Sequence, residues 1–289
     1  MKRENANIDA DTAMGTMLKY GSEGSNYFVN NYILPKDIAA AHMNGDIHIH
    51  DKDFYMLTET CCQIDLMKLF KNGFSTGHGR LREPNSITSY SALACIAIQA
   101  NQNEMHGGQS VPNFDYAMAD GVKKTFQKEY AYALDTFQKI KPDAKEGEAE
   151  KYAEGAAWER TDKLTYQAME SLIHNLNTMN SRAGAQVPFS SLNYGTDTSL
   201  EGRMVAKNLL MATQAGLGNG ETPIFPVQIF KVKEGINYNP EDPNYDLFKL
   251  AMETSAKRLF PNFSFLDAPF NLQYYKEGDY NSEVAYMGC

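Results

Sequence analysis

Residues 45–66 read Gly-Asp-Ile-His-Ile-His-Asp-Lys-Asp-Phe-Tyr-Met-Leu-Thr-Glu-Thr-Cys-Cys-Gln-Ile-Asp-Leu. This stretch places two alternating histidines, a series of aspartates and two adjacent cysteines close together in the chain. Residues 47–50 alternate between apolar and polar, so on a β-strand both imidazoles lie on one face. We therefore predict a strand that begins at Asp46 and turns His48 and His50 toward a pocket.

The composition is that of a globular protein rather than a membrane or DNA-binding protein. The 289 residues are 43% hydrophobic, which is enough for one large α/β domain or two smaller ones. No window approaches the roughly 18 apolar residues of a membrane span, and the first residues form no signal peptide. The net charge of −9, without a long basic run, argues against DNA as a partner. Four cysteines without a Cys-x-x-Cys pair indicate reduced thiols in a cytoplasmic protein.

Helical spacing and helix-end residues predict most of the helices. Pro35 stands at a helix start and Gly45 just after its end, with three alanines between them. Two long adjacent helices, 114–140 and 148–177, are joined by a charged connector, which predicts a helical hairpin and a dimer surface. The same reasoning predicts the helices 22–32, 86–101, 200–215 and 245–259.

Strands alternate with helices in the second half of the chain. The pattern predicts strands over 187–192, 224–230 and 262–266, and a last short strand over 284–287. This spacing predicts a parallel sheet with right-handed crossovers. Residues 71–85 and 103–110 are predicted loops, and paired glycines in the second loop permit its backbone to approach another group closely.

The histidine-rich stretch has three interpretations. His-x-His followed by Asp51 at a strand end begins the metal site of many barrel hydrolases, because both imidazoles point inward. Such a site needs ligands from later strands, and the other histidines do not sit at later predicted strand ends. In the second interpretation, the histidines and Asp51 stabilise a strand by hydrogen bonding. In the third, they contact substrate.

The cysteine pair is open to two interpretations as well. Adjacent cysteines on an extended chain point to opposite faces, so only one of Cys61 and Cys62 can face a given pocket. The simpler interpretation is that both are buried small side chains, like Cys95 in its apolar helix.

Two polar segments outside residues 45–66 are candidates for a binding site. Residues 106–110 form either a phosphate or sugar cradle or a plain turn. Residues 180–193 lead from a helix into a strand, where polar side chains of a barrel converge, although turn chemistry also explains them. The candidate binding residues there are Ser190, Ser191 and Asn193.

Motifs along the whole chain, taken together, resemble the anaerobic (class III) ribonucleoside-triphosphate reductases, which are glycyl-radical enzymes. They are residues 19–25 (Lys-Tyr-Gly-Ser-Glu-Gly-Ser), 45–55, 60–65 (Thr-Cys-Cys-Gln-Ile-Asp), 180–193, 220–226 (Gly-Glu-Thr-Pro-Ile-Phe-Pro) and 285–289 (Ala-Tyr-Met-Gly-Cys). The resemblance implies an α/β fold that forms the first part of a ten-stranded barrel. That barrel consists of two five-stranded halves with a finger loop through its centre.

The resemblance also implies the reacting groups. Cys289 matches the fingertip cysteine, which becomes a thiyl radical and abstracts the ribose 3′ hydrogen. A second cysteine donates to the 2′ side of the ribose, and formate supplies the electrons. The family pattern favours Cys61 over Cys62 as this second cysteine. His48, His50 and the polar side chains of 190–193 are then walls of a pocket for ribonucleoside triphosphates. No metal ligand is predicted among these residues.

The resemblance divides the chain into 1–110 (first barrel strand and helices), 111–180 (hairpin) and 181–289 (strands and start of the finger loop). The hairpin is expected to form a homodimer and to bind a deoxynucleotide effector, whose contact residues are not assigned. A regulatory ATP-cone is expected to be absent. The zinc-binding cysteines and the glycyl-radical loop, which a radical-SAM enzyme activates, are expected to lie beyond Cys289. We therefore expect this polypeptide alone to be inactive.

Three rival hypotheses remain. The first is a nucleotide-binding and dimerising fragment without catalysis. The second is a metal-dependent hydrolase built on His48 and His50. The third is a glycyl-radical lyase, which fits less well because those enzymes carry adjacent cysteines on the finger loop.

Overall fold

The centre of the structure is a parallel β-sheet. The computed structural model describes residues 12–55, 59–180 and 186–288. Five strands lie in the order β1-β4-β5-β6-β7, and each neighbouring pair is parallel, which confirms the predicted α/β class. These strands are β1 (Cys62–Gln63), β4 (Gln109–Val111), β5 (Ser190–Tyr194), β6 (Val227–Val232) and β7 (Asn262–Phe265).

Helices make the connections between these strands, as parallel pairing requires. They pack on one another and bury the large apolar core, which includes Leu192 and Tyr194 of β5 and Phe230 of β6. The long helices are α4 (Ile87–Glu104), α5 (Phe114–Ile140), α6 (Glu148–Thr178), α7 (Leu200–Ala215) and α8 (Tyr245–Arg258). Smaller elements are α3 (Leu66–Phe70), α9 (Pro269–Leu272), two 3-10 turns (Lys52–Phe54, Tyr280–Ser282) and the antiparallel pair β2 (Phe74–Ser75) and β3 (Arg80–Leu81).

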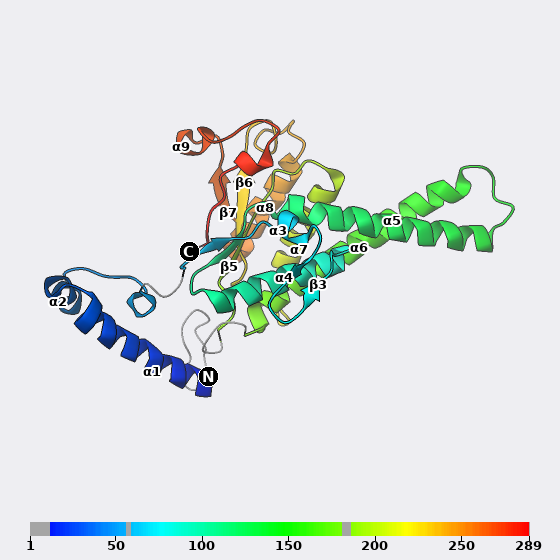
Figure 1. Ribbon diagram of the computed structural model, residues 1–289. Helices are drawn as coiled ribbons and strands as arrows, with labels where there is room; N and C mark the ends of the chain where they lie inside the picture. The colour runs from blue at the N-terminus through cyan, green and yellow to red at the C-terminus, as the bar shows by residue number, and fades with distance from the viewer. Residues whose placement is uncertain (1–11, 56–58, 181–185, 289) are drawn as a thin grey trace.

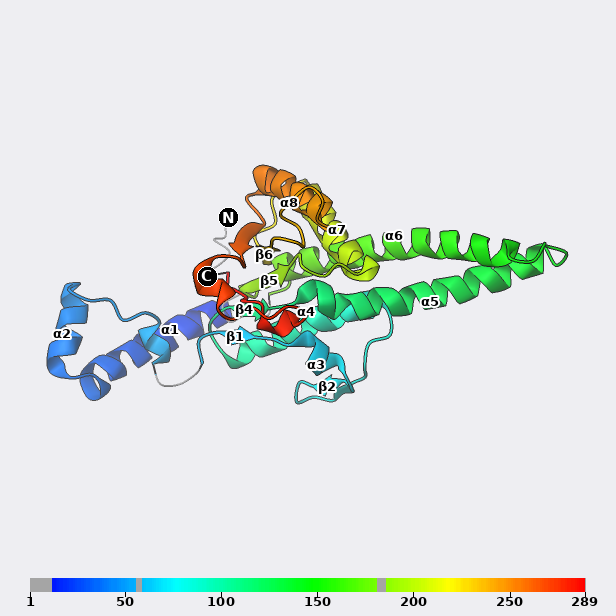
Figure 2. The ribbon, with the colours of Figure 1, turned by 90° about the horizontal axis from the view of Figure 1, so that it is seen from above.

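The predicted hairpin is formed by α5 and α6, which project from the sheet (Figures 1 and 2). The buried side chains of α5 end at Thr125, and its second half projects beside α6 (Figure 2). Ala149, Ala153 and Ala157 of α6 recur every four residues and are buried, which lets the two helices approach closely.

A second projection lies at the amino-terminal end of the described chain. It consists of α1 (Ala13–Phe28), a π-helical turn (Val29–Ile33) and α2 (Lys36–Asn44), and it extends away from the sheet on the side opposite the hairpin (Figure 1). Gly45 ends α2 with φ of 83°, a conformation that favours glycine. Large apolar side chains are exposed along it: Met14, Met17, Tyr20, Tyr27, Phe28, Tyr32 and Ile33.

The predicted strand at Asp46 is wrong. Residues 46–50 form no strand, because the chain folds back on α2: the Asp46 amide donates to the Ala41 carbonyl, and the Ile49 amide to His42 Nδ1. Asp51 then turns with φ of 47° into a 3-10 turn that contacts α1. Period-two alternation over four residues was therefore insufficient evidence for a strand, and the first strand is β1.

Other strand predictions need smaller corrections. β4 lies at the end of a segment predicted as a loop, because three residues carry too little pattern to recognise. β5 and β6 begin three residues later than predicted, and residues 284–287 form no strand. No helix in the described part of the chain is long and apolar enough to cross a membrane.

Candidate active site

Alternation along β5 divides its side chains between the two faces of the sheet. Leu192 and Tyr194 belong to the core beneath the helices. Ser191 and Asn193 are out of step with them and therefore point to the other face, where both are also buried. Strand register aligns Ser191 with Ser110 of β4 and with Gln63 of β1. We call this side the polar face, defined by Gln63, Ser110, Ser191 and Asn193.

Residues 283–288, here called the terminal segment, lie across the polar face. The Tyr286 amide donates to Asn193 Oδ1 at 2.8 Å, and the Tyr286 carbonyl accepts from Asn193 Nδ2 at 2.9 Å and Ser110 Oγ at 3.1 Å. The Ala285 carbonyl accepts from Gln63 Nε2 at 3.2 Å. Side chains from three neighbouring strands thus hold this backbone.

The terminal segment runs from the carboxyl ends of the strands toward their beginnings. Glu283 contacts Lys231, near the end of β6. Gly288 packs at the start of that strand, where an added Cβ would lie 2.7 Å from Val227 Cβ and 3.1 Å from Ser191 Cβ. Cys289 lies outside the described residues, but it follows Gly288 directly. The described part of the segment therefore ends, at Gly288, on the polar face near the level of Gln63 and Ser191.

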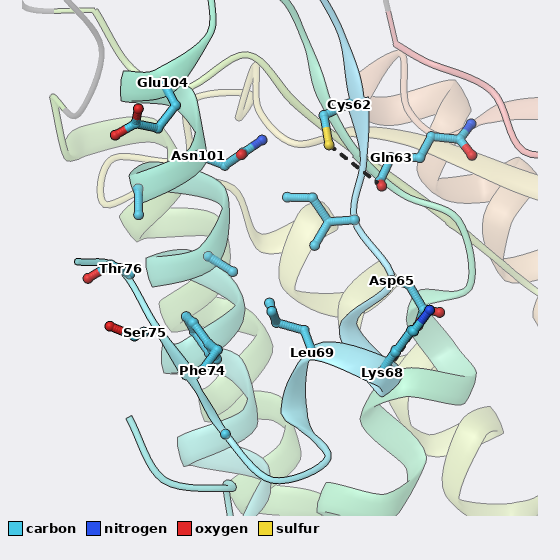
Figure 3. Close-up of a pocket in the computed structure, with 14 residues that line it drawn as sticks. Cys62, Gln63, Asp65, Lys68, Leu69, Phe74, Ser75, Thr76, Asn101 and Glu104 are labelled. Carbon is cyan, nitrogen blue, oxygen red and sulfur yellow. Dashed lines mark hydrogen bonds between the residues drawn. The ribbon is translucent and has the colours of Figure 1, made fainter. Parts of the chain in front are cut away.

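The two cysteines of the pair differ in their surroundings. Cys62 lines a cavity of about 730 Å³ between β1, α3 and α4, and its Sγ lies 3.6 Å from the Gln63 carbonyl oxygen. Figure 3 shows the Cys62 sulfur directed into this cavity and the Gln63 side chain directed away from it. Cys61 is exposed. It lies two residues before Gln63, so on an extended chain its side chain is on the same side as Gln63, which is the side of the polar face.

Gly107 explains how Cys61 is held. A Cβ at this position would lie 1.1 Å from the Thr60 carbonyl oxygen and 2.9 Å from Cys61 Sγ. Only a residue without a side chain permits this approach of the loop before β4 to the chain before β1. The predicted close backbone approach in this loop is therefore confirmed for Gly107.

A cluster of histidines lies next to this contact. Asp51 Oδ2 is 3.3 Å from both His50 Nε2 and His106 Nε2. His106 is buried and stacks on Phe54 with ring centroids 4.4 Å apart, whereas the His50 side chain is 84% exposed. His48 is exposed, with its ring centroid 5.8 Å from that of His50. Thus His106 joins the Asp51 cluster predicted from the sequence, and the two histidines of the motif do not point together into the sheet.

A buried ion pair fixes the beginning of the terminal segment. Lys231 Nζ lies 2.9 Å from Glu283 Oε2, and the two side chains are 0% and 4% exposed. Thr196 Oγ1 donates to the same carboxylate at 2.7 Å, and Lys231 also donates to Asn113 Oδ1 at 2.7 Å. Burial raises the pKa of nearby Asp115, although Lys231 and two backbone amides oppose that rise. Lys231 of β6, Thr196 after β5 and Asn113 after β4 thus converge on this ion pair.

Residues 4–289 match the family described as anaerobic ribonucleoside-triphosphate reductase. The chain belongs to this family. It is 32% identical over 262 residues to the anaerobic ribonucleoside-triphosphate reductase of Salmonella typhimurium, an alignment that covers 90% of the chain and 35% of that relative. The enzyme of phage T4 is also 32% identical, and 41% of its length is covered. The chain therefore spans well under half the length of these relatives.

Solved structures of anaerobic ribonucleotide reductases share the fold. The Thermotoga maritima protein in complex with dATP and CTP superposes with a TM-score of 0.61 at 15% identity, over 92% of this chain and 44% of that one. The same protein with glycerol in its active site gives a TM-score of 0.62 at 14% identity, over 93% and 44%. At this identity the likeness is evidence for the fold alone.

The reductase motifs do not assemble a metal site in the described part of the chain. Within residues 12–55, 59–180 and 186–288, no group of three or more histidine, cysteine or acidic side chains could hold a metal ion. The zinc implied by the resemblance therefore has no ligand set among these residues. Among the same residues, His48 and His50 also lack the further ligands that the hydrolase hypothesis requires.

The structure brings together only some of the predicted site residues. Ser191 and Asn193 lie on the polar face, whereas Ser190 alternates to the helix-covered face, where its buried Oγ has no hydrogen-bond partner among the described residues. Sequence reasoning did not single out Gln63 and Lys231. Their signal was a polar side chain inside a short strand, which becomes informative only when strand register is known.

Proposed function

We propose that the whole protein reduces ribonucleoside triphosphates to 2′-deoxyribonucleoside triphosphates, with Cys289 and Cys61 as the reacting thiols. Family membership supports the reaction class. The observation that carries the residue assignment is the course of the terminal segment, which leads to Cys289 along the side of the sheet to which Cys61 belongs. Cys62 instead lines a cavity on the other side of β1.

The proposed reaction balances as ribonucleotide, formate and one proton giving deoxyribonucleotide, carbon dioxide and water. A thiyl radical at Cys289 takes the ribose 3′ hydrogen and later returns it. The 2′ hydroxyl leaves as water, and Cys61 gives a hydrogen atom to C2′. Formate returns a hydrogen atom to Cys61 and gives one further electron, which together with one proton reduces the 3′-keto group, so formate leaves as carbon dioxide. The glycyl radical implied by the family supplies the radical to Cys289.

Proton donors for loss of the 2′ hydroxyl are available beside Cys61. The His50–Asp51–His106 cluster adjoins Gly107, which contacts Cys61. His106 is the more suitable proton carrier, because it is buried and its ring is fixed by Phe54. The Ser191 hydroxyl also lies on the polar face, and it donates to the Gln109 carbonyl at 3.5 Å instead of holding Tyr286, so we assign it a substrate contact.

Single thiol substitutions test the assignment. In the whole protein, activated anaerobically and supplied with formate, Cys61→Ser should lower kcat by about three orders of magnitude, because it removes a reacting atom. Cys62→Ser should stay within about threefold of the wild type. Formation of deoxynucleotide is measured by chromatography, and glycyl-radical content by electron paramagnetic resonance. The opposite ranking of the two variants contradicts the assignment, and no product from the wild type contradicts the proposed reaction.

We also propose the larger assembly that the family implies: a ten-stranded barrel, a homodimer formed through the α5–α6 hairpin, a deoxynucleotide effector there, a radical-SAM activating partner and a cytoplasmic location. Two observations support the barrel and the dimer. Within the described residues β1 and β7 are open edges of the sheet, which call for pairing. Tyr132 and Ile140 are at least 70% exposed on the protruding half of α5. Sedimentation with and without dATP tests the dimer, and a monomer at every concentration contradicts it.

A further inference from the structure

The backbone of residues 284–288 is held differently from that of a strand. Its hydrogen bonds to other described residues all come from side chains, those of Gln63, Ser110 and Asn193. A strand in this place would pair with neighbouring backbone instead. The position of this segment therefore depends on a few side chains, and a single substitution can change it.

Asn193 makes the most specific of these contacts. Its amide group donates through Nδ2 to the Tyr286 carbonyl at 2.9 Å and accepts through Oδ1 from the Tyr286 amide at 2.8 Å. One side chain thus satisfies both backbone groups of a single residue. Ser110 supports it, because Ser110 Oγ accepts from Asn193 Nδ2 at 3.1 Å and donates to the same Tyr286 carbonyl. Asn193 is 0% exposed, so water does not compete for this pair.

The segment is also fixed at its other end. The buried Lys231–Glu283 pair lies three residues before Tyr286, and the Tyr286 hydroxyl donates to Asn271 Oδ1 at 2.6 Å. Cys289 lies three residues after Tyr286, within about 10 Å at full extension. Tyr286 is the last residue before Cys289 whose backbone is hydrogen-bonded to a described side chain, so its position limits where the thiol can reach.

We propose that Asn193 is a positioning residue. It holds the Tyr286 backbone, and thereby limits the Cys289 thiol to positions from which it can abstract the ribose 3′ hydrogen. This proposal rests on the proposed reductase function. Asn193 is then not a substrate contact, because both ends of its amide are already used. A shift of about 1 Å in a reacting group costs about a hundredfold in rate, so loss of this pair should affect kcat far more than KM.

The test compares Asn193→Ala with Tyr194→Phe in the whole protein. Tyr194 is the neighbouring residue, equally buried but directed to the helices, where its hydroxyl donates to Gln228 Oε1 at 2.7 Å. Both variants delete buried hydrogen bonds made by side chains of β5. Of the two residues, Asn193 contacts the terminal segment and Tyr194 contacts Gln228. Hydrogen exchange of the Tyr286 backbone amide, which donates to Asn193, is measured by mass spectrometry, together with kcat, KM and radical content.

Asn193→Ala should raise exchange of the Tyr286 amide about thirtyfold, as expected for the loss of both hydrogen bonds between Asn193 and Tyr286. It should lower kcat about a hundredfold, with KM and radical content within about twofold of the wild type. Tyr194→Phe should change neither exchange in the segment nor kcat. Unchanged exchange in Asn193→Ala, or equal losses of kcat in the two variants, overturns the proposal.

Ser110→Ala keeps the proposal testable where Asn193→Ala does not fold. It removes only the hydroxyl that supports Asn193 and the Tyr286 carbonyl, and it should raise exchange of the Tyr286 amide by about fivefold. Unchanged exchange in this variant overturns the proposal in that case. The exchange measurement does not require turnover. It therefore tests the hydrogen bonds between Asn193 and Tyr286 separately from the proposed reaction.

Discussion

Tyr90 joins two helices through a small charged cluster. Its hydroxyl, on α4, donates to the Asp120 carboxylate and accepts from Lys124 Nζ at 3.0 Å, and both partners lie on α5. Lys124 also pairs with Asp120 at 2.6 Å and with Glu83 at 2.9 Å. Burial and the Asp120 hydrogen bond raise the pKa of Tyr90 to about 12, so its phenol stays protonated and continues to donate at neutral pH.

This cluster predicts a pH-dependent contribution to stability. Burial raises the pKa of Asp120, but hydrogen bonds from Lys124 and Tyr90 outweigh burial and lower it. A carboxyl group with a lowered folded pKa stabilises the fold above its unfolded pKa of about 4, and that contribution is lost as pH falls through the folded pKa. Asp120→Asn should therefore reduce the free energy of unfolding by about 1 kcal/mol at pH 7, a value kept small because the group is half exposed.

Urea denaturation at pH 7 and pH 3 measures this effect. The difference between wild type and Asp120→Asn should shrink toward zero at pH 3. Asp135→Asn is the matched control, because its pair with Lys139 is also four residues apart on α5 but is more exposed. A cost for Asp120→Asn that is equal at both pH values contradicts the ionic explanation.

Residue identity pointed to side chains that the structure places near one another, but it did not reveal their geometry. The cysteine pair, His50 with Asp51, and Asn193 were all recognised from motifs, and all lie near the polar face or the loop beside it. The roles of Asn193 and Ser190 depend on which face of β5 each one occupies, and the sequence pattern of β5 does not reveal this. Its residues are all buried, so polar and apolar positions do not report which face is solvent-exposed.

At the scale of elements, the loop before β4 depends on one glycine. Replacing Gly107 with alanine places a Cβ inside the contact distance of the Thr60 carbonyl oxygen, so β1 or the loop must move. We expect Gly107→Ala to lower the free energy of unfolding by about 3 kcal/mol and to displace Cys61. Thermal denaturation and turnover of the whole protein measure the two effects.

Gly155→Ala is the control for this substitution. Gly155 lies within α6, and an added Cβ there meets no atom within 4 Å. It should raise the free energy of unfolding by about 0.7 kcal/mol, because alanine favours the helix over the unfolded chain. Equal effects of the two substitutions contradict the close contact at Gly107.

Helices were predicted more accurately than strands for a physical reason. The predicted bounds 114–140 and 200–215 agree with α5 and α7, since each helix carries several turns of apolar periodicity. By contrast, β1 and β4 are two and three residues long and are defined by pairing with distant neighbours. Local pattern cannot identify elements whose existence depends on tertiary contacts.

At the scale of the whole molecule, the parallel sheet arranges segments far apart in sequence. Gln63, Ser110 and Ser191 share one register level, although up to 128 residues separate them in the chain. The terminal segment crosses this level from the ends of the strands toward their beginnings. The central claim is that this arrangement brings Cys289 to Cys61 and not to Cys62.

Disulfide mapping tests that claim most directly, because a disulfide requires Cα atoms within about 7 Å. The whole protein is oxidised mildly without substrate, and linked peptides are identified by mass spectrometry in Cys61→Ser and Cys62→Ser variants. We predict that Cys62→Ser forms the link between residues 61 and 289, and that Cys61→Ser forms no link to residue 289. A link between residues 62 and 289 in Cys61→Ser, with none in Cys62→Ser, would contradict the account.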